Sequence, residues 1–222
     1  MAEYPLLVNL SGRRCVVVGG GPVGRRKAAG LLDAGALVRL IDPQPPVAGD
    51  LPTGIELVPR SYRPDDLQGA FLVFAATGDR RLDRAVAAEA RCRGALVNLP
   101  GEPTAGDFTL PAMLRRGDLL LSVSTAGRSP ALAALLKEQL DHWLPPHWAT
   151  VLQILAALRD KHLAQPGPSH YNRQISDRLL RAGLADLTAA GDGPAIDKLL
   201  LEIAGVGCSL HELAVELPAG RE

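Results

Sequence analysis

One glycine-rich run, at residues 19–24, limits the possible folds of this chain more than any other feature. Its sequence, Gly-Gly-Gly-Pro-Val-Gly, directly follows an apolar, β-branched run at 15–18 and directly opens a helical pattern. Gly35 ends that pattern, and a second apolar run follows at 37–41. Strand, tight turn, helix and strand within roughly 30 residues are typical of a βαβ unit with a G-x-G-x-x-G fingerprint. The sequence therefore predicts a Rossmann-type unit at the N-terminus.

The three glycines of the fingerprint have separate physical roles. Gly19 allows the tight turn, Gly21 lets a pyrophosphate approach the backbone, and Gly24 allows the helix to pack closely on the strand. The N-terminus of the helix offers free N–H groups to phosphate. The alternative is a glycine-rich turn that binds no ligand, but the strand before it and the helix after it favour a nucleotide site.

A carboxylate follows the second strand of this unit. Asp42 lies about 20 residues beyond the fingerprint, where a carboxylate accepts hydrogen bonds from the adenosine ribose and repels a 2′-phosphate. This position favours NAD over NADP. Two observations weigh on the other side: Asp42 precedes a proline and is also placed to cap a turn, and Arg39 supplies a positive charge nearby.

Further strands alternate with a helix after this unit. Apolar runs that predict strands lie at 55–58, 71–76 and 95–98, and a helical pattern lies at 79–93. The runs are nearly all apolar, as strands covered on both faces are. We therefore expect an α/β fold with a doubly wound parallel sheet. Proline and glycine residues then interrupt the chain, and we place the NAD-binding Rossmann domain at 1–111.

The segment 112–145 predicts a small mixed region of strand and helix. A strand is expected at 119–123, and a helix is expected to start at Ser129-Pro130, where a hydroxyl cap precedes proline at the first helical position. The apolar stripe of this helix consists of Leu132, Leu135, Leu136 and Leu140. Such a stripe either packs within its own subunit or forms a dimer contact.

The segment 146–222 predicts a helical C-terminal module. Helical patterns lie at 147–163, 171–182 and 192–203, and a Pro-Gly-Pro break lies at 166–168. We see no internal repeat that would indicate a solenoid. The expected fold is thus a Rossmann-type sheet followed by a small mixed dimerisation segment and a helical module.

The charge balance excludes some partners. The 222 residues include 24 basic and 24 acidic side chains, so the formal net charge is zero and no overall field attracts nucleic acid or an anionic membrane. No apolar stretch approaches the roughly 20 residues that span a bilayer, and the N-terminus lacks a secretory signal pattern, so we expect a cytoplasmic protein. The three cysteines and five histidines show no spacing typical of metal ligands or of a disulfide framework, and no metal site is predicted.

Three groups of residues together resemble one protein family. They are Tyr4-Pro5-Leu6 with Asn9-Leu10, then Val18 to Val23 with Arg26-Lys27, and finally Phe108-x-Leu-Pro111 followed by Ser124-Thr125-x-Gly127-x-Ser129-Pro130. With these motifs the chain resembles precorrin-2 dehydrogenase, the NAD-dependent part of sirohaem synthases, from about residue 3 to 145 and more loosely beyond. The last motif is the most specific, since few other Rossmann proteins open a helix in this way.

The resemblance implies a reaction. Precorrin-2 gives up a hydride to NAD and a proton to a base, which yields sirohydrochlorin. In some members the same site then inserts ferrous iron, which is a lyase (ferrochelatase) activity. The resemblance also implies a homodimer whose tetrapyrrole cleft lies between the Rossmann unit and the second domain, with the leucine stripe as a dimer contact.

The resemblance also implies positions for the ligands. The residues expected to hold NAD are Gly19, Gly21, Pro22, Val23 and Gly24 of the fingerprint, Asp42, Pro43 and Gln44 on the adenosine side, and Thr77 and Asn98 at strand ends. Asp79, close to Thr77, is equally placed as a helix cap. The residues expected on the tetrapyrrole side are Thr125, Arg128 and Ser129. As the cation for a polycarboxylate, Arg128 is favoured over Arg115, Arg116 and Lys137 because it lies just before a helix N-terminus.

One departure from the family's pattern affects the chemistry. After the fifth strand the family's pattern is Asn-x-x-Asp, whose aspartate is the candidate proton-handling group, and here Gly101 takes its place. Positioned acid–base catalysis contributes about 10²–10⁴-fold. Three replacements are open: Glu102 with its longer side chain, Asp107 from the end of the loop, or a substrate carboxylate together with water. We prefer Glu102, and the alternative for it is an exposed loop carboxylate.

Three functions are compatible with these residues. They are an NAD-dependent precorrin-2 dehydrogenase, a sirohydrochlorin chelatase that no longer oxidises, and a non-catalytic protein that binds tetrapyrrole or NAD. The intact fingerprint favours the dehydrogenase, because a hydride acceptor has no evident role in a pure chelatase or carrier.

Overall fold

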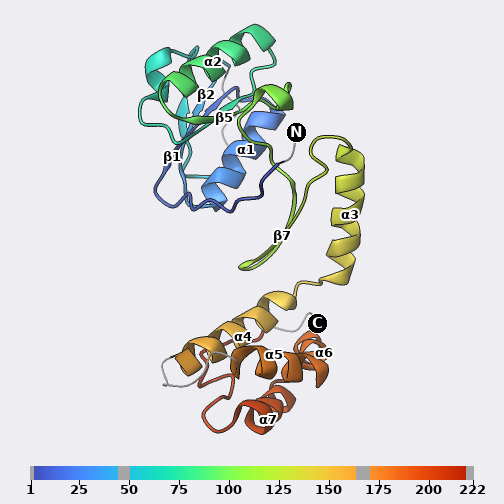
Figure 1. Ribbon diagram of the computed structural model, residues 1–222. Helices are drawn as coiled ribbons and strands as arrows, with labels where there is room; N and C mark the ends of the chain where they lie inside the picture. Colours follow the sequence, from blue (N-terminus) through green and yellow to red (C-terminus); the bar gives the residue numbers. More distant parts are fainter. Residues whose placement is uncertain (1–2, 45–50, 164–170, 219–222) are drawn as a thin grey trace. The chain divides into compact units, whose positions relative to one another are not determined.

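The computed structural model describes residues 3–44, 51–163 and 171–218, and the chain divides into two units (Figure 1). The first unit comprises Met1–Leu110 with Ala126–Arg128, and the second comprises Pro111–Thr125 with Ser129–Glu222. The first unit holds a parallel sheet, and the second holds a β-hairpin and a group of helices.

Five parallel strands form the sheet of the first unit. In chain order they are β1 (Arg14–Val18), β2 (Leu37–Ile41), β3 (Glu56–Val58), β4 (Leu72–Ala75) and β5 (Leu96–Asn98). Their order across the sheet is β3-β2-β1-β4-β5, and every neighbouring pair is parallel. The strand order reverses between β1 and β4, and such folds bind nucleotides beyond the carboxyl ends of the strands at this reversal. The predicted doubly wound fold is confirmed.

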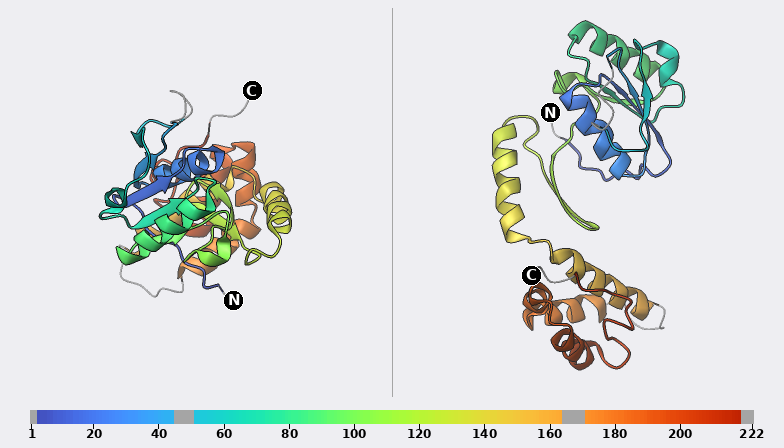
Figure 2. Two further views of the ribbon diagram at one scale, coloured as in Figure 1. Left: turned by 90° about the horizontal axis from the view of Figure 1, so that it is seen from above. Right: turned by 180° about the vertical axis from the view of Figure 1, so that it is seen from behind.

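Helices cover both faces of this sheet because both faces of its strands are apolar. Cys15 of β1 belongs to the buried cluster on one face and Val16 to the cluster on the other, and the alternation continues along the strand. α1 (Pro22–Asp33) covers the Cys15 face, and α2 (Arg80–Cys92) covers the Val16 face. Figure 2 shows the two helices on opposite sides of the sheet.

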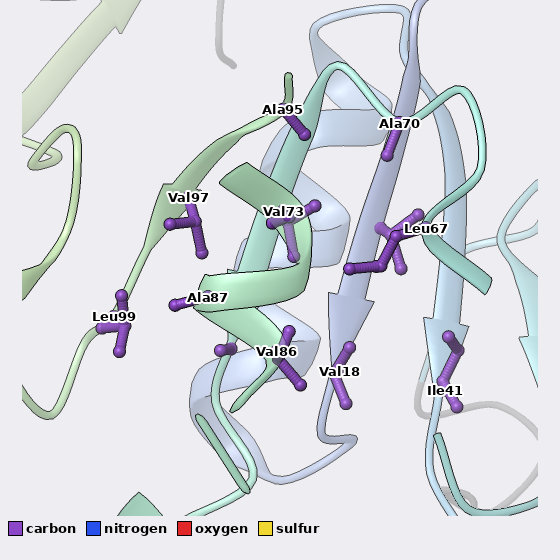
Figure 3. Close-up of a cluster of buried hydrophobic side chains, with 13 residues drawn as sticks. Val18, Ile41, Leu67, Ala70, Val73, Val86, Ala87, Ala95, Val97 and Leu99 are labelled. Carbon is purple, nitrogen blue, oxygen red and sulfur yellow. The ribbon is translucent and has the colours of Figure 1, made fainter. Parts of the chain in front are cut away.

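The cluster beneath α2 anchors that helix to two strands. Val86 and Ala87 of α2 pack with Val73 of β4 and Val97 of β5, and all four side chains are fully or almost fully buried (Figure 3). Burial of a valine-sized side chain stabilises the fold by about 1.5–3 kcal/mol relative to exposure. This packing fixes α2 over the two strands whose carboxyl ends carry several candidate site residues.

Two short 3-10 helices in the first unit have no clear pattern in the sequence. η1 (Pro64–Leu67) is held by the carboxylate of Asp66, which is 3% exposed. This carboxylate accepts hydrogen bonds of 2.8 and 2.6 Å from Arg60 and one of 2.8 Å from the backbone N–H of Arg63. η2 (Pro103–Ala105) lies in the loop after β5. The partly buried ion pair thus fixes a connection that an amphipathic pattern does not predict.

A hairpin and a long helix open the second unit. β6 (Ala112–Arg116) pairs antiparallel with β7 (Leu119–Val123), and α3 (Pro130–Trp143) runs beside them (Figure 1). Ser129 caps α3, because its hydroxyl oxygen accepts a hydrogen bond from the N–H of Leu132 at 3.3 Å. The predicted helix start is therefore confirmed, whereas the sequence pattern predicts only the second of the two strands.

Four further helices pack around their own core. They are α4 (Trp148–Leu163), α5 (Tyr171–Arg181), α6 (Leu184–Ala190) and α7 (Gly193–Ala204). The fully buried side chains at the centre of this cluster include Ile154, Leu179, Leu184, Ile196 and Leu200. The sequence predicts three of the helices but not the short α6, and the Pro-Gly-Pro break at 166–168 lies outside the described residues. Within the described ranges, no helix combines the length and the hydrophobicity that a membrane span requires.

Candidate functional site

Two of the fingerprint glycines lie where backbones approach too closely for a side chain. Gly19 has a φ of +108°, and a Cβ there would lie 2.3 Å from the carbonyl oxygen of Ala76, just after β4. A Cβ on Gly24 would lie 1.8 Å from the carbonyl oxygen of Gly19. Both distances are far below any real Cβ contact, so both positions require glycine. The turn after β1 is thereby pressed against the chain after β4, at the reversal of strand order.

Gly21 lacks a side chain for a different reason. A Cβ there would meet no atom of the described residues within 4 Å, and its φ of −66° and ψ of 178° suit any residue. The backbone at Gly21 is therefore left open to a ligand rather than packed. Pro22 is the first residue of α1, whose first-turn N–H groups have no partner within the helix. Val23, which follows it, is 38% exposed. An open backbone beside a helix N-terminus fits the pyrophosphate of a dinucleotide.

The carboxylate of Asp42 links the glycine loop to the end of β2. Its Oδ2 atom accepts a hydrogen bond of 2.5 Å from the N–H of Gly20, and its Oδ1 atom accepts one of 2.7 Å from the N–H of Gln44. The turn cap considered from the sequence is therefore present. Each carboxylate oxygen has a further lone pair, so a ribose hydroxyl can still donate to it. Pro43 and Gln44 beside it are exposed.

The side chain of Arg39 is paired with a carboxylate on the neighbouring strand. Its guanidinium donates hydrogen bonds of 2.9 and 2.6 Å to the two carboxylate oxygens of Glu56 in β3, and it lies 4.0 Å from Asp66. Bidentate pairing of this kind fixes the orientation of the guanidinium. The positive charge near Asp42 is thus already paired with the carboxylate of Glu56.

Thr77 and Asp79 stabilise the start of α2. The backbone N–H and the hydroxyl of Thr77 both donate to the same Asp83 oxygen, at 3.0 and 2.8 Å. Asp79 is the N-cap of α2, since its Oδ1 atom accepts from the N–H groups of Arg81 at 2.8 Å and Leu82 at 3.3 Å. The helix-cap interpretation of Asp79 is therefore confirmed, and Thr77 is held at the carboxyl edge of β4.

Asn98 ends β5 and is 5% exposed. Its side-chain amide donates a hydrogen bond of 2.8 Å to the carbonyl oxygen of Phe108. The ring of Phe108 in turn packs edge-on against Phe74 of β4, with a centroid distance of 5.5 Å. Asn98 therefore fixes the returning end of the loop that follows β5.

Gly101 lies in this loop with open space around it. A Cβ there would meet no atom of the described residues within 4 Å, so the backbone would accept a side chain. The side chain of Glu102 is only 19% exposed, unlike the exposed loop carboxylate considered from the sequence. Its Oε2 atom accepts from Arg84 of α2 at 2.9 Å, and its Oε1 atom lies 3.9 Å from Arg80. That Oε1 atom is buried and has no hydrogen-bond partner among the described residues.

Asp107 has both carboxylate oxygens occupied. Oδ1 accepts from Arg91 of α2 at 2.8 Å, and Oδ2 accepts from the N–H of Val97 in β5 at 2.9 Å. The backbone N–H of Asp107 also donates to the carbonyl oxygen of Val97 at 2.8 Å. Asp107 therefore ties the loop to the outer edge of β5 and to α2.

The residues expected on the tetrapyrrole side lie together in the loop between β7 and α3. The hydroxyl oxygen of Thr125 accepts a hydrogen bond of 3.1 Å from the N–H of Ser129, which closes the loop across two residues of positive φ, Ala126 and Gly127. The exposed side chain of Arg128 has no hydrogen bond or ion pair in the described part of the chain. Arg128 thus remains available for an anionic ligand.

Of the three other cations weighed in this region, one has a structural role. Arg116 donates to the carbonyl oxygen of Leu144 at 2.8 Å and pairs with Asp141 of α3 at 2.6 Å. It therefore ties the hairpin to the end of α3. Arg115 is exposed and Lys137 is partly buried.

Lys27 is a further candidate that the sequence motif contains but for which the sequence suggests no role. It lies on the second turn of α1 and is partly buried. Burial lowers the pKa of its ammonium group, and the neighbouring charge of Arg26 lowers it further. The available signal in the sequence is a lysine three residues after the last fingerprint glycine, which by itself does not separate a buried cation from a solvated one.

Two family models match consecutive parts of the chain. The family described as putative NAD(P)-binding matches residues 6–112, and the family described as sirohaem biosynthesis protein central matches residues 116–142. The first of these matches lies almost entirely within the first unit. The second match includes the Ser-Thr-x-Gly-x-Ser-Pro motif.

The chain is also similar to curated proteins and to a solved structure. The siroheme synthases of Pseudomonas entomophila (strain L48) and Nitrosomonas eutropha (strain DSM 101675 / C91 / Nm57) are 35% and 34% identical to it, over 90% and 91% of this chain. Those alignments cover 44% and 43% of the relatives, so the chain spans less than half the length of the curated relatives it matches. The structure of SirC, precorrin-2 dehydrogenase, matches with a TM-score of 0.64 and 25% identity, over 80% of this chain and 89% of that chain.

These findings confirm the resemblance that the three sequence motifs predict. The family matches contain both the fingerprint of the first unit and the motif that opens α3. The structural match extends over most of both chains, so the likeness is not limited to the common Rossmann sheet. The chain is therefore similar, over most of its length, to siroheme synthases and to a precorrin-2 dehydrogenase.

Proposed function

We propose that this chain binds NAD on the fingerprint turn and oxidises precorrin-2 to sirohydrochlorin. The observation that carries the proposal is the open backbone at Gly21, between two glycines that packing alone explains. A turn built only for packing has no need of a third glycine where a side chain would meet nothing. When bound, NAD accepts the hydride that leaves the substrate, and the oxidation also releases one proton.

The contacts of Asp42 and Arg39 support NAD rather than NADP. Asp42 presents a carboxylate at the end of β2, where a 2′-phosphate would be repelled. Arg39 is the nearby cation that would offset this repulsion, but Glu56 and Asp66 hold its guanidinium. We expect NAD to bind at least about tenfold more tightly than NADP, which corresponds to about 1.4 kcal/mol.

The substrate is a polycarboxylate, so a chain of zero net charge must meet it with local cations. Arg128 is exposed and unpaired among the described residues, and it lies one residue before the cap of α3. Its charge therefore adds to the positive end of the helix dipole. Thr125 and Ser129 would line the same part of the substrate site.

The released proton needs an acceptor, and Glu102 is a better candidate than Asp107. Asp107 uses both carboxylate oxygens to hold the loop, whereas Glu102 keeps one oxygen without a hydrogen bond. We expect Glu102→Gln to slow dehydrogenation by about 10²-fold or more while NAD affinity stays unchanged. A rate within about threefold of the parent protein would assign the proton instead to a substrate carboxylate and water. Gly101→Asp is a second variant for testing the proton acceptor, because the position has room for the new carboxylate.

The α3 surface supports a homodimer. Leu132, Leu135 and Leu136 of the expected stripe are between 38% and 57% exposed, and α3 buries Ala133 instead. Exposed leucines that lie together on one helix face are typical of an interface. We expect Leu135→Glu to shift the protein from dimer to monomer in sedimentation velocity measurements.

One anaerobic assay tests the proposed reaction against its alternatives. The purified protein is supplied with precorrin-2, with and without NAD, and separately with sirohydrochlorin and ferrous iron. A dehydrogenase forms NADH and sirohydrochlorin only in the NAD arm. Metal insertion without any NADH formation would instead support a chelatase, and NAD binding without turnover would support a non-catalytic role.

A further inference from the structure

Lys27 is a cation for which the proposed reaction so far has no use. It is partly buried on the second turn of α1, and its ammonium has no hydrogen bond or ion pair among the described residues. Desolvation disfavours the charged form of such a group unless an opposite charge lies beside it. The burial of an unpaired ammonium is therefore a cost that an arriving anion would remove.

The helical phase places Lys27 on a defined flank of α1. Gly24, Ala28 and Leu31 form the buried stripe that faces the sheet. Leu32 flanks this stripe on the side of β3, because its side chain lies 3.3 Å from a Cβ built on Gly54, just before that strand. Lys27 and Leu32 are separated by roughly 140° around the helix, on either side of the stripe. Lys27 therefore lies on the opposite flank, toward β4 and β5.

The direction of helical side chains brings Lys27 near the fingerprint turn. Its Cα lies roughly 7.5 Å along the axis from Pro22, the first residue of the helix. Side chains in an α-helix tilt toward its N-terminus, so a long side chain on the second turn covers the turn before it. We therefore expect the ammonium of Lys27 to point back toward the carboxyl edge of the sheet, on the side of β4. Thr77, Asn98 and the loop after β5 lie on the same side.

We propose that Lys27 binds an anionic oxygen of a ligand held at the carboxyl edge of the sheet, either a phosphate of the dinucleotide or a carboxylate of the tetrapyrrole. The inference rests on the proposed function, which supplies both anions. Lys27 is then a specificity-determining residue that favours the anionic ligand over a neutral analogue. It neutralises one negative charge in a place where water is partly excluded, which makes the interaction stronger than a surface ion pair.

Arg26 provides a matched control for Lys27. It is one position earlier in α1, it is exposed, and its helical phase points it away from the sheet. Lys27→Gln and Arg26→Gln remove the same charge from adjacent residues, and Lys27→Arg keeps the charge. Binding of NAD and of sirohydrochlorin to each protein is measured by anaerobic fluorescence titration at low ionic strength. Unfolding in urea is measured in parallel, so that a loss of fold is not mistaken for a loss of binding.

The pattern of affinities identifies the anion. We expect Lys27→Gln to weaken one of the two ligands by about tenfold or more, and Arg26→Gln to weaken neither by more than about twofold. If Lys27→Gln binds NAD more weakly, the anion bound by Lys27 is a phosphate of the dinucleotide. If it binds sirohydrochlorin more weakly, the anion is a carboxylate of the tetrapyrrole. In NMR titrations of the parent protein, the pKa of the Lys27 ammonium should rise when that ligand is added, which a purely structural lysine would not show. Affinities of Lys27→Gln within about twofold of the parent for both ligands would overturn the inference and leave the proposed function intact. Failure of the parent protein to bind either ligand would overturn both.

Discussion

Replacement of Gly21 by alanine should separate ligand binding from folding. The backbone of Gly21 has φ −66° and ψ 178°, which alanine adopts without strain, and the new methyl group would meet no described atom within 4 Å. The free energy of unfolding should therefore change by no more than about 0.5 kcal/mol. The methyl group would instead occupy the space where a pyrophosphate approaches the turn. Loss of one hydrogen bond to a charged group costs about 1.5–3 kcal/mol, so NAD should bind about 10- to 100-fold more weakly.

Gly30 gives a matched control within the same helix. It lies in the interior of α1, and a Cβ there would also meet no described atom within 4 Å. Alanine is favoured over glycine in a helix interior by about 0.5–1 kcal/mol, so Gly30→Ala should stabilise the protein slightly and leave NAD affinity unchanged. Calorimetric titration with NAD and unfolding in urea measure both quantities for each variant.

The effects of Gly21→Ala on stability and on NAD binding are independent of each other. If Gly21→Ala bound NAD as tightly as the parent protein, the open backbone at this position would not be the pyrophosphate site. If it lost several kcal/mol of stability, the turn would differ from the geometry described above. A parallel loss of NAD affinity in Gly30→Ala would show that any added methyl group in α1 disturbs binding.

Three further substitutions test the surroundings of the site. Gly24→Ala places a Cβ 1.8 Å from the carbonyl oxygen of Gly19, so it should cost about 1–3 kcal/mol in urea unfolding and also weaken NAD binding; an unchanged midpoint would contradict the close packing. Asn98→Ala leaves the Phe108 carbonyl without its buried donor and should cost about 1–3 kcal/mol, and thermal unfolding within about a degree of the parent would show that the bond contributes nothing. The hydrogen bond from Arg60 lowers the pKa of Asp66. The ion pair of Asp66 with Arg60 therefore stabilises the fold above about pH 4, and this contribution is lost as the pH falls through the lowered pKa of Asp66. Asp66→Asn should remove that part of the acid destabilisation, and an unchanged pH dependence of the unfolding free energy would refute its assignment to this carboxylate.

The elements with strong periodic patterns are those that the sequence predicts well. The first βαβ unit is clear because an apolar run, a glycine fingerprint and an amphipathic helix all indicate the same structure. β6 is not predicted, because two of its five residues are arginines and because it exists through pairing with β7. α6 is missed because it has only seven residues and starts after Gly183, which has a φ of +92°. Short elements of this kind depend on tertiary contacts more than on local preference.

The candidate site likewise has features that the sequence predicts and features that it does not. The glycine roles follow from the order of strand, turn and helix, and the cap at Ser129 follows from its place before a proline. The contacts of Asp107 and Glu102 could not be predicted, because they depend on which arginines of α2 face the loop after β5. The occupation of Arg39 by Glu56 likewise depends on the register of β2 and β3. Local patterns therefore predict where the backbone meets a ligand, and tertiary packing decides which side chains are free to act.

The proposed function depends on a dinucleotide whose pyrophosphate lies on the open backbone between β1 and α1. This position of the pyrophosphate is tested by titrating isotopically labelled protein with NAD while the backbone amide signals are monitored by NMR. We expect the largest shifts at the backbone amides of residues 19–21 and 23–25, with smaller shifts at Asp42 and Thr77, and we expect all of them to saturate together at one affinity. Shifts confined to other parts of the chain, or none at millimolar NAD, would contradict it.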